Sequence, residues 1–323
     1  MHPMKSITVL SSGIQYSYRD SGAPKDDNYL TVFAIHGLFF SGAVFNKLLE
    51  LAPDNGIRLV AINRRGYPGS TPFTDSEAAV FGEDVSEERR LEFAKNRAVE
   101  LLAFIGAFIK NENLPPASQN EGGTATGGFS LMGWSLGSAV TFTTLACIEE
   151  APIDVQKLVS ENLRGVIVLD TPNVTLNLPF PAGFWSPLFD FQIPEDLRGH
   201  LFAHLATSYY SHPNTKSRDP SQLSHVIPST HRVPTIFNIT PEDQKEVISV
   251  NKDTYPDLAL TRFWGPLHYE NYRKVCFDEE FKKRFPLLKI GVVYGTSSPA
   301  ASYLAVWKME RDNEEAGGNV LRF

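Results

Sequence analysis

The chain has 323 residues, of which 42% are hydrophobic and 21% charged, a composition that excludes a fibrous or wholly disordered protein. Thirty Lys and Arg against 37 Asp and Glu give a net charge of −7 without a basic cluster, which favours a small-molecule partner over nucleic acid or an anionic membrane. Two cysteines, and no apolar run of signal-peptide or membrane-spanning length, predict a soluble cytoplasmic protein without a disulfide framework or cysteine zinc site.

The first predicted elements are strands. Residues 7–10 and 14–18 flank a short connection that contains glycine, which indicates a hairpin. Residues 30–35 and 57–62 are short apolar runs that end in polar or glycine turns, as strands buried on both faces do. From residue 87 to 109 apolar side chains recur every three or four positions and predict a long helix. The segment 111–128, rich in Gly, Asn, Thr and Pro, predicts a surface loop.

Strand and helix patterns then alternate, with strands at 129–132 and 163–169 and a helix at 136–150. This order predicts an α/β fold with a doubly wound, mostly parallel sheet. Residues 173–285 interrupt it with many aromatics and prolines and six of the eight histidines, and we interpret them as an inserted helical lid. A strand at 287–294, a helix at 299–315 and the start of a strand at 319–323 follow. The predicted core is therefore 1–172 and 286–323.

The segment 133–137, GWSLG, lies between a predicted strand and a predicted helix. A turn this sharp forces strained backbone angles on Ser135 and lifts its hydroxyl above the sheet edge, while the flanking glycines allow close packing. The first turn of the helix supplies free amides for an oxyanion. The alternative is a serine N-cap beside unrelated glycines.

A second motif, HGLF at 36–39, follows the predicted strand 30–35. Gly37 allows the chain to turn back over the sheet, so that the amide of Leu38 joins that of Leu136 in an oxyanion hole for Ser135. We interpret His36 as a structural residue whose ring hydrogen-bonds this loop, because a base must reach the serine from the opposite side.

Together with RGYPGS at 65–70, these motifs resemble the α/β-hydrolase superfamily, in its lidded branch of esterases and epoxide-hydrolase-like enzymes, over nearly the whole chain. The resemblance implies an α/β-hydrolase fold with Ser135 as the nucleophile. Members that open epoxides or displace halide carry Asp there, so a serine implies acyl transfer. The expected activity is hydrolysis of an ester, thioester, lactone or C–C bond in a small or medium apolar acyl substrate, without metal or cofactor.

The chain departs from the family at the triad acid. The usual position, in the segment YGTSSP at 294–299, has neither Asp nor Glu. Asp170, at the end of the predicted strand 163–169, occupies an alternative position that some members use. Its other interpretation is a turn-forming aspartate whose side chain bonds nearby amides.

The second departure is the base, which the family places in a loop after the last strand. No histidine follows His268, so we expect the chain to end a few residues before that loop. His268 is a possible substitute, although a surface or lid-packing histidine is the simpler interpretation. A hydrolase is therefore the first prediction, and a binding protein that has lost its base is the alternative. The aromatic residues of the predicted lid either line a substrate pocket or form the lid's own core. They include Phe184, Trp185, Phe189, Phe191, Phe263 and Trp264.

Overall fold

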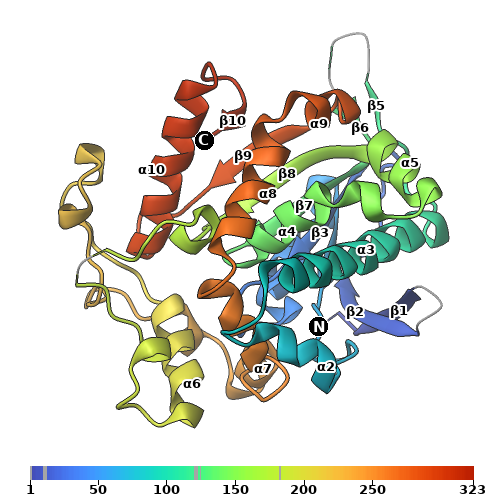
Figure 1. Cartoon of the computed structure of the whole chain (residues 1–323). Coiled ribbons are helices and arrows are strands. Elements are labelled where there is room, and N and C mark those ends of the chain that lie inside the picture. Colours follow the sequence, from blue (N-terminus) through green and yellow to red (C-terminus); the bar gives the residue numbers. More distant parts are fainter. Residues whose placement is uncertain (1, 10–12, 120–122, 124, 182) are drawn as a thin grey trace.

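A central eight-stranded sheet organises the molecule (Figure 1), which we describe from a computed structural model for residues 2–9, 13–119, 123, 125–181 and 183–323. The strand order is β1-β2-β4-β3-β7-β8-β9-β10. The pairs β1–β2 and β2–β4 are antiparallel and the other pairs are parallel. The mostly parallel α/β architecture is therefore confirmed. The strands are β1 (Lys5–Val9), β2 (Ile14–Asp20), β3 (Leu30–Ile35), β4 (Ile57–Ile62), β7 (Phe129–Trp134), β8 (Leu163–Leu169), β9 (Lys289–Val293) and β10 (Leu321–Arg322).

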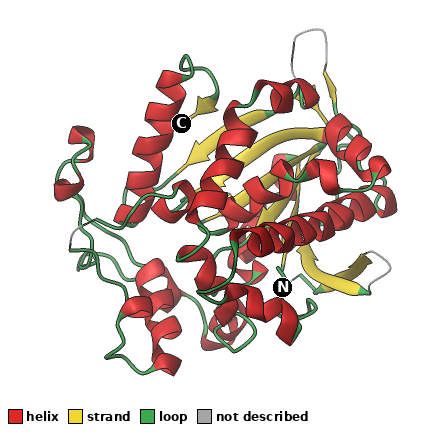
Figure 2. Cartoon of the chain, in the orientation of Figure 1, coloured by secondary structure: helices red, strands yellow, loops and turns green. Residues whose placement is uncertain are grey.

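Helices cover the sheet, as Figure 2 shows. They are α1 (Asn46–Leu51), α2 (Asp75–Ala78), α3 (Glu87–Asn111), α4 (Gly137–Ala146), α5 (Ile153–Asn162), α6 (Glu195–Ala206), α7 (Pro241–Val247), α8 (Gly265–Phe277), α9 (Glu279–Arg284) and α10 (Ala300–Glu315). The long predicted helix is confirmed as α3. The Ser86 side chain caps it, and two glutamates in the first turn complement its dipole.

The alternation of side chains on β3 explains why its sequence is apolar throughout. Phe33 points to the face covered by α3, where its ring lies 5.3 Å from that of Phe108 in an edge-to-face arrangement. Val32 and Ala34 point to the other face, where they pack in a cluster with Leu49 of α1. Because both faces are covered, the strand shows no polar alternation.

Some predicted bounds are wrong. The predicted helix 136–150 is α4 followed by the 3₁₀ turn Ile148–Glu150, and the separate helix α5 was not predicted. The apolar periodicity of α5 in the sequence is weak because this helix buries only Val155 and Val159. The predicted loop 111–128 contains a two-stranded ladder of β5 (Ser118–Gln119) and β6 (Ala125–Thr126). Of the predicted hairpin, residues 10–12 lie outside the described residues.

The proposed lid, 173–285, is less helical than expected. Its first part holds α6 and α7 among loops and short 3₁₀ turns, beside the sheet in Figure 1. Its last part differs, because α8 packs against α4 and places Tyr272, Val275 and Cys276 in the main core. No helix within the described ranges has both the length and the apolar character required to cross a membrane.

Candidate active site

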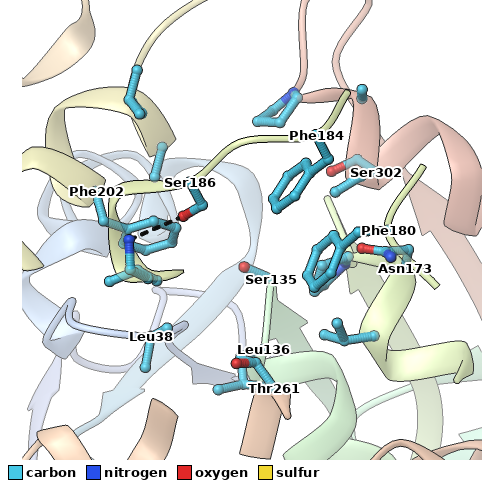
Figure 3. A pocket seen from close by; sticks show the side chains of 18 of the residues that line it. Leu38, Ser135, Leu136, Asn173, Phe180, Phe184, Ser186, Phe202, Thr261 and Ser302 are labelled. Carbon is cyan, nitrogen blue, oxygen red and sulfur yellow. Dashed lines mark hydrogen bonds between the residues drawn. The ribbon is translucent and has the colours of Figure 1, made fainter. Parts of the chain in front are cut away.

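Ser135 occupies the turn that joins β7 to α4. Its φ of +53° lies in the left-handed region, a strained conformation for a serine. Its amide donates to the carbonyl of Leu169 at 2.8 Å, which fastens the turn to the end of β8. Figure 3 shows its hydroxyl between Phe202 and Phe184 on the wall of a cavity. The predicted strained bend with an open hydroxyl is therefore present.

The glycines around Ser135 are required by close backbone packing. A Cβ atom on Gly133 would lie 2.5 Å from the Cα of Ser138, and one on Gly137 would lie 2.2 Å from the carbonyl oxygen of Ile35. A Cβ on Gly37 would lie 3.0 Å from the Cβ of Ser135, so the loop after β3 rests directly on the serine. The two predicted motifs, distant in sequence, thus meet at one point.

The two predicted oxyanion donors, Leu38 and Leu136, are buried and line the same cavity as Ser135. Within the described part of the chain, neither main-chain amide donates a hydrogen bond to another protein group. Two N–H groups beside the serine are therefore free to bind an oxygen of a ligand.

A buried polar network holds the loop that carries Leu38. Phe39 has a φ of +61°, and its amide donates to the hydroxyl of Tyr67 at 3.0 Å. That hydroxyl donates to Asp257 at 2.8 Å, and Arg64 pairs with Asp257 at 2.6 Å while also donating to the carbonyl of Gly37 at 3.0 Å. Burial raises the pKa of Tyr67 well above its usual value, so the hydroxyl keeps its proton. The network fixes a strained loop at both of its ends.

His36 has the structural role predicted for it. One ring nitrogen, Nδ1, lies 2.9 Å from the carbonyl oxygen of Gly37, and the other, Nε2, accepts the amide of Arg64 at 3.1 Å. Burial, with the nearby Arg64 charge, holds the pKa of His36 well below its usual value. The ring is therefore neutral and fully used within the loop.

Asp170 follows β8 and lines the cavity with Ser135, at a φ of +46°. Its Oδ1 accepts the hydroxyl of Ser298 at 2.6 Å and the amide of Gly295 at 3.2 Å. Both partners belong to the loop after β9, so the carboxylate joins two strand ends. Among the described residues no histidine hydrogen-bonds to Asp170, and its predicted role in orienting a base stays a prediction.

His225 is the histidine that lines the Ser135 cavity. Its Nε2 lies 3.0 Å from the carbonyl oxygen of Pro220, and its buried Nδ1 has no partner among the described residues. Because a carbonyl only accepts, Nε2 carries the proton in the neutral form of the ring, and Nδ1 is then the acceptor. Sequence reasoning missed this residue, since it lies in a loop that carries no motif.

His268 does not line this cavity. It is buried, its Nε2 lies 3.1 Å from the carbonyl oxygen of Leu260, and burial lowers its pKa to about 4. It lines a second cavity of about 80 Å³, together with Arg64 and Trp264. The interpretation of His268 as a packing residue is confirmed.

The cavity above Ser135 has a volume of about 180 Å³ and a mainly apolar wall. Of the six lid aromatics singled out in the sequence, Phe184, Trp185 and Phe189 line it. Trp264 is buried in a separate core cluster against which Phe263 packs, and Phe191 is 75% exposed. The rings of Phe180 and Phe184 stack with centroids 4.1 Å apart. The lid aromatics thus divide between pocket, core and surface.

A mostly parallel sheet with a strained serine between strand and helix is the arrangement typical of an α/β-hydrolase. Residues 32–274 match the model of the alpha/beta hydrolase family, and the chain belongs to that family. The resemblance found in the sequence is therefore confirmed, and the family supports a hydrolase. No curated protein matches the chain.

Solved structures share the fold at low sequence identity. A candidate aryl esterase from Burkholderia cenocepacia is 16% identical with a TM-score of 0.51, covering 99% of this chain and 89% of the esterase. Potato (Solanum tuberosum) epoxide hydrolase I is 12% identical with a TM-score of 0.51, covering 97% of this chain and 98% of the hydrolase. At such identities the likeness concerns the fold alone.

Proposed function

We propose that the chain is a serine hydrolase that cleaves a neutral, apolar, ester-like substrate through an acyl-enzyme on Ser135. The observation that carries this proposal is the strained φ of +53° at Ser135, with its hydroxyl open to the cavity. Strain of this kind persists where the surrounding structure imposes it, and it concentrates at reactive positions. A serine that only capped α4 would have no need of it.

In the proposed reaction, the Ser135 hydroxyl oxygen attacks the substrate carbonyl carbon and loses its proton to a histidine. The amides of Leu38 and Leu136 hold the negative oxygen of the tetrahedral intermediate. The alcohol or thiol then leaves with the proton that the histidine took. Water next attacks the acyl-enzyme, giving a proton to the histidine, which returns it to the Ser135 oxygen as the acid is released. Asp170 is the proposed acid that orients this histidine.

A second candidate function is ligand binding without catalysis. One observation favours it: in the described part of the chain, no histidine hydrogen-bonds to Ser135 or to Asp170. A serine hydroxyl without a neighbouring base is a weak nucleophile. The oxyanion donors and substrate binding nevertheless retain roughly 10³–10⁴-fold catalysis over water when a triad member is absent.

A fluorophosphonate probe tests the proposal, because its phosphorus atom is attacked by an activated serine and fluoride leaves. We expect mass spectrometry to find the label on Ser135 and Ser135→Ala to abolish it. Ser186→Ala is the matched control, since Ser186 lines the same cavity but its hydroxyl accepts the amide of Leu188 at 3.3 Å. A folded protein that binds apolar esters but takes no label supports the binding protein instead.

A further inference from the structure

Asn173 is a cavity residue that the proposed reaction does not use. It begins the 3₁₀ turn Asn173–Leu176, three residues after Asp170, and it is fully buried. It lines the cavity above Ser135, and Figure 3 shows it beside Phe180 with its side-chain oxygen turned to the side of Ser135. Most buried side-chain polar atoms in proteins have a hydrogen-bond partner, which is protein, water or a ligand.

The hydrogen bonds of Asn173 fix the direction of its amide group. Its Nδ2 donates to the carbonyl of Leu178 at 2.9 Å and to that of Pro179 at 3.1 Å, which uses both N–H bonds. A flipped amide would place an acceptor against two acceptors. Oδ1 therefore points away from these carbonyls, and among the described residues it has no donor.

The rest of the wall indicates what reaches Oδ1. The described residues that line the cavity include neither Lys nor Arg, and the one carboxylate among them is that of Asp170. A negatively charged ligand would be desolvated there without a cation, so an anionic substrate is disfavoured. The stacked rings of Phe180 and Phe184 offer an apolar surface next to Asn173.

We propose that Asn173 is a specificity residue whose Oδ1 accepts a hydrogen bond from a hydroxyl or amide N–H group of the substrate. The substrate class is then a neutral ester-like compound with an apolar acyl chain that carries one such donor. A substrate without the donor leaves a buried acceptor unpaired, and sites built in this way reject it strongly. The assignment to a substrate rests on the proposed function, whereas the hydrogen bond itself requires no catalysis.

Binding to the Ser135→Ala variant of the full chain tests the proposal without chemistry. Calorimetric titration compares ethyl 2- and 3-hydroxyhexanoate with the 2- and 3-methoxy esters and with ethyl hexanoate. Methoxy and hydroxyl groups both accept hydrogen bonds but only the hydroxyl donates, so the affinity ratio isolates donation. We expect one hydroxy ester to bind between fivefold and a hundredfold more tightly than its methoxy partner, the range that an unpaired buried acceptor costs.

Adding Asn173→Leu removes the acceptor at similar volume, and the ratio should then fall to about one. The ratio within each variant is the readout, because a general weakening of the pocket affects both esters alike. Equal affinities in Ser135→Ala overturn the proposal, even where Asn173→Leu fails to fold. A ratio that survives Asn173→Leu but falls on His225→Phe overturns it as well, because the acceptor is then His225 Nδ1.

These outcomes are independent of the labelling experiment. Loss of fluorophosphonate labelling with a retained hydroxyl preference leaves Asn173 as a binding determinant in a protein that does not catalyse hydrolysis. Labelling without any hydroxyl preference leaves the hydrolase and removes the role of Asn173.

Discussion

Replacement of Gly137 by alanine should destabilise the chain because α4 and β3 approach each other too closely for a side chain. The added Cβ would lie 2.2 Å from the carbonyl oxygen of Ile35, whereas real Cβ contacts essentially never fall below 3.0 Å. The helix must therefore move by at least 3.0 − 2.2 = 0.8 Å relative to the strand. Forced overpacking of this kind costs roughly 1–3 kcal/mol, and backbone on both sides gives little room for relief.

The assay is thermal unfolding followed by circular dichroism, with urea unfolding as a second measure. One kcal/mol corresponds to roughly 2–4 °C in a large domain, so we expect Gly137→Ala to melt roughly 2–12 °C below the wild type. The displacement also moves the proposed oxyanion donors, since Ile35 directly precedes the loop that carries Leu38. Labelling of Ser135 should slow by tenfold or more, because loss of one donor alone costs about 10²–10³.

Gly291→Ala is the matched control. Gly291 lies in β9, its φ is not in the left-handed region, and a Cβ there would meet no atom within 4 Å. This variant should be neutral or more stable by up to about 1 kcal/mol, because alanine restricts the unfolded chain. Equal melting temperatures for the two variants would refute the close approach of α4 to β3, and with it the geometric basis for the elbow.

Two further predictions concern histidines. His225→Asn should change the rate of Ser135 labelling by less than tenfold, because among the described residues the hydrogen-bond partner of its ring is Pro220 and not Ser135. A loss of a hundredfold or more, typical of a general base, would assign His225 that role. Burial lowers the pKa of His268 in the folded chain to about 4, below the ~6.5 of an unfolded histidine. As pH falls, the unfolded chain therefore binds the proton first. The free energy of unfolding then decreases from pH 6.5 to 5 by up to about 1.4 kcal/mol per pH unit. His268→Gln should reduce this slope in urea unfolding at pH 7 and 5, although His36 contributes in the same sense, and an unchanged slope would contradict the burial of His268.

The sheet and the elbow were predictable because their signals are local. The bounds of β3, β4 and β8 follow from apolar runs that end at turns, and the glycines of GWSLG are dictated by backbone contacts within a few residues or with the adjacent strand. The helix α5 was missed because only two of its side chains face the core. Its burial depends on α3, a contact that sequence periodicity does not record.

The partners of the site residues were not predictable, because they come from distant segments. Asp170 was correctly placed at a strand end, yet its hydrogen bond to Ser298 spans 128 residues of sequence. His225 reaches the cavity from a loop without periodicity, through the packing of the segment that surrounds it. Asn173 lies three residues after Asp170 in the sequence. Its proposed role as an acceptor can be inferred only from the structure, which shows that two carbonyls occupy its Nδ2 and so fix the direction of its Oδ1.

Hydrogen bonds join the proposed lid to the loop that carries Leu38. Phe39 accepts the amide of Ser249 at 2.8 Å, and Ser41 donates to the carbonyl of Val247 at 2.9 Å, so a lid segment pairs with the loop in the manner of a strand. Asp257, also from the lid, holds the Tyr67 hydroxyl that binds the Phe39 amide. A lid displacement that separated Asp257 from Tyr67 would therefore remove one support of the strained loop. These hydrogen bonds between the proposed lid and the loop thus help to hold the amide of Leu38, a proposed oxyanion donor, beside Ser135.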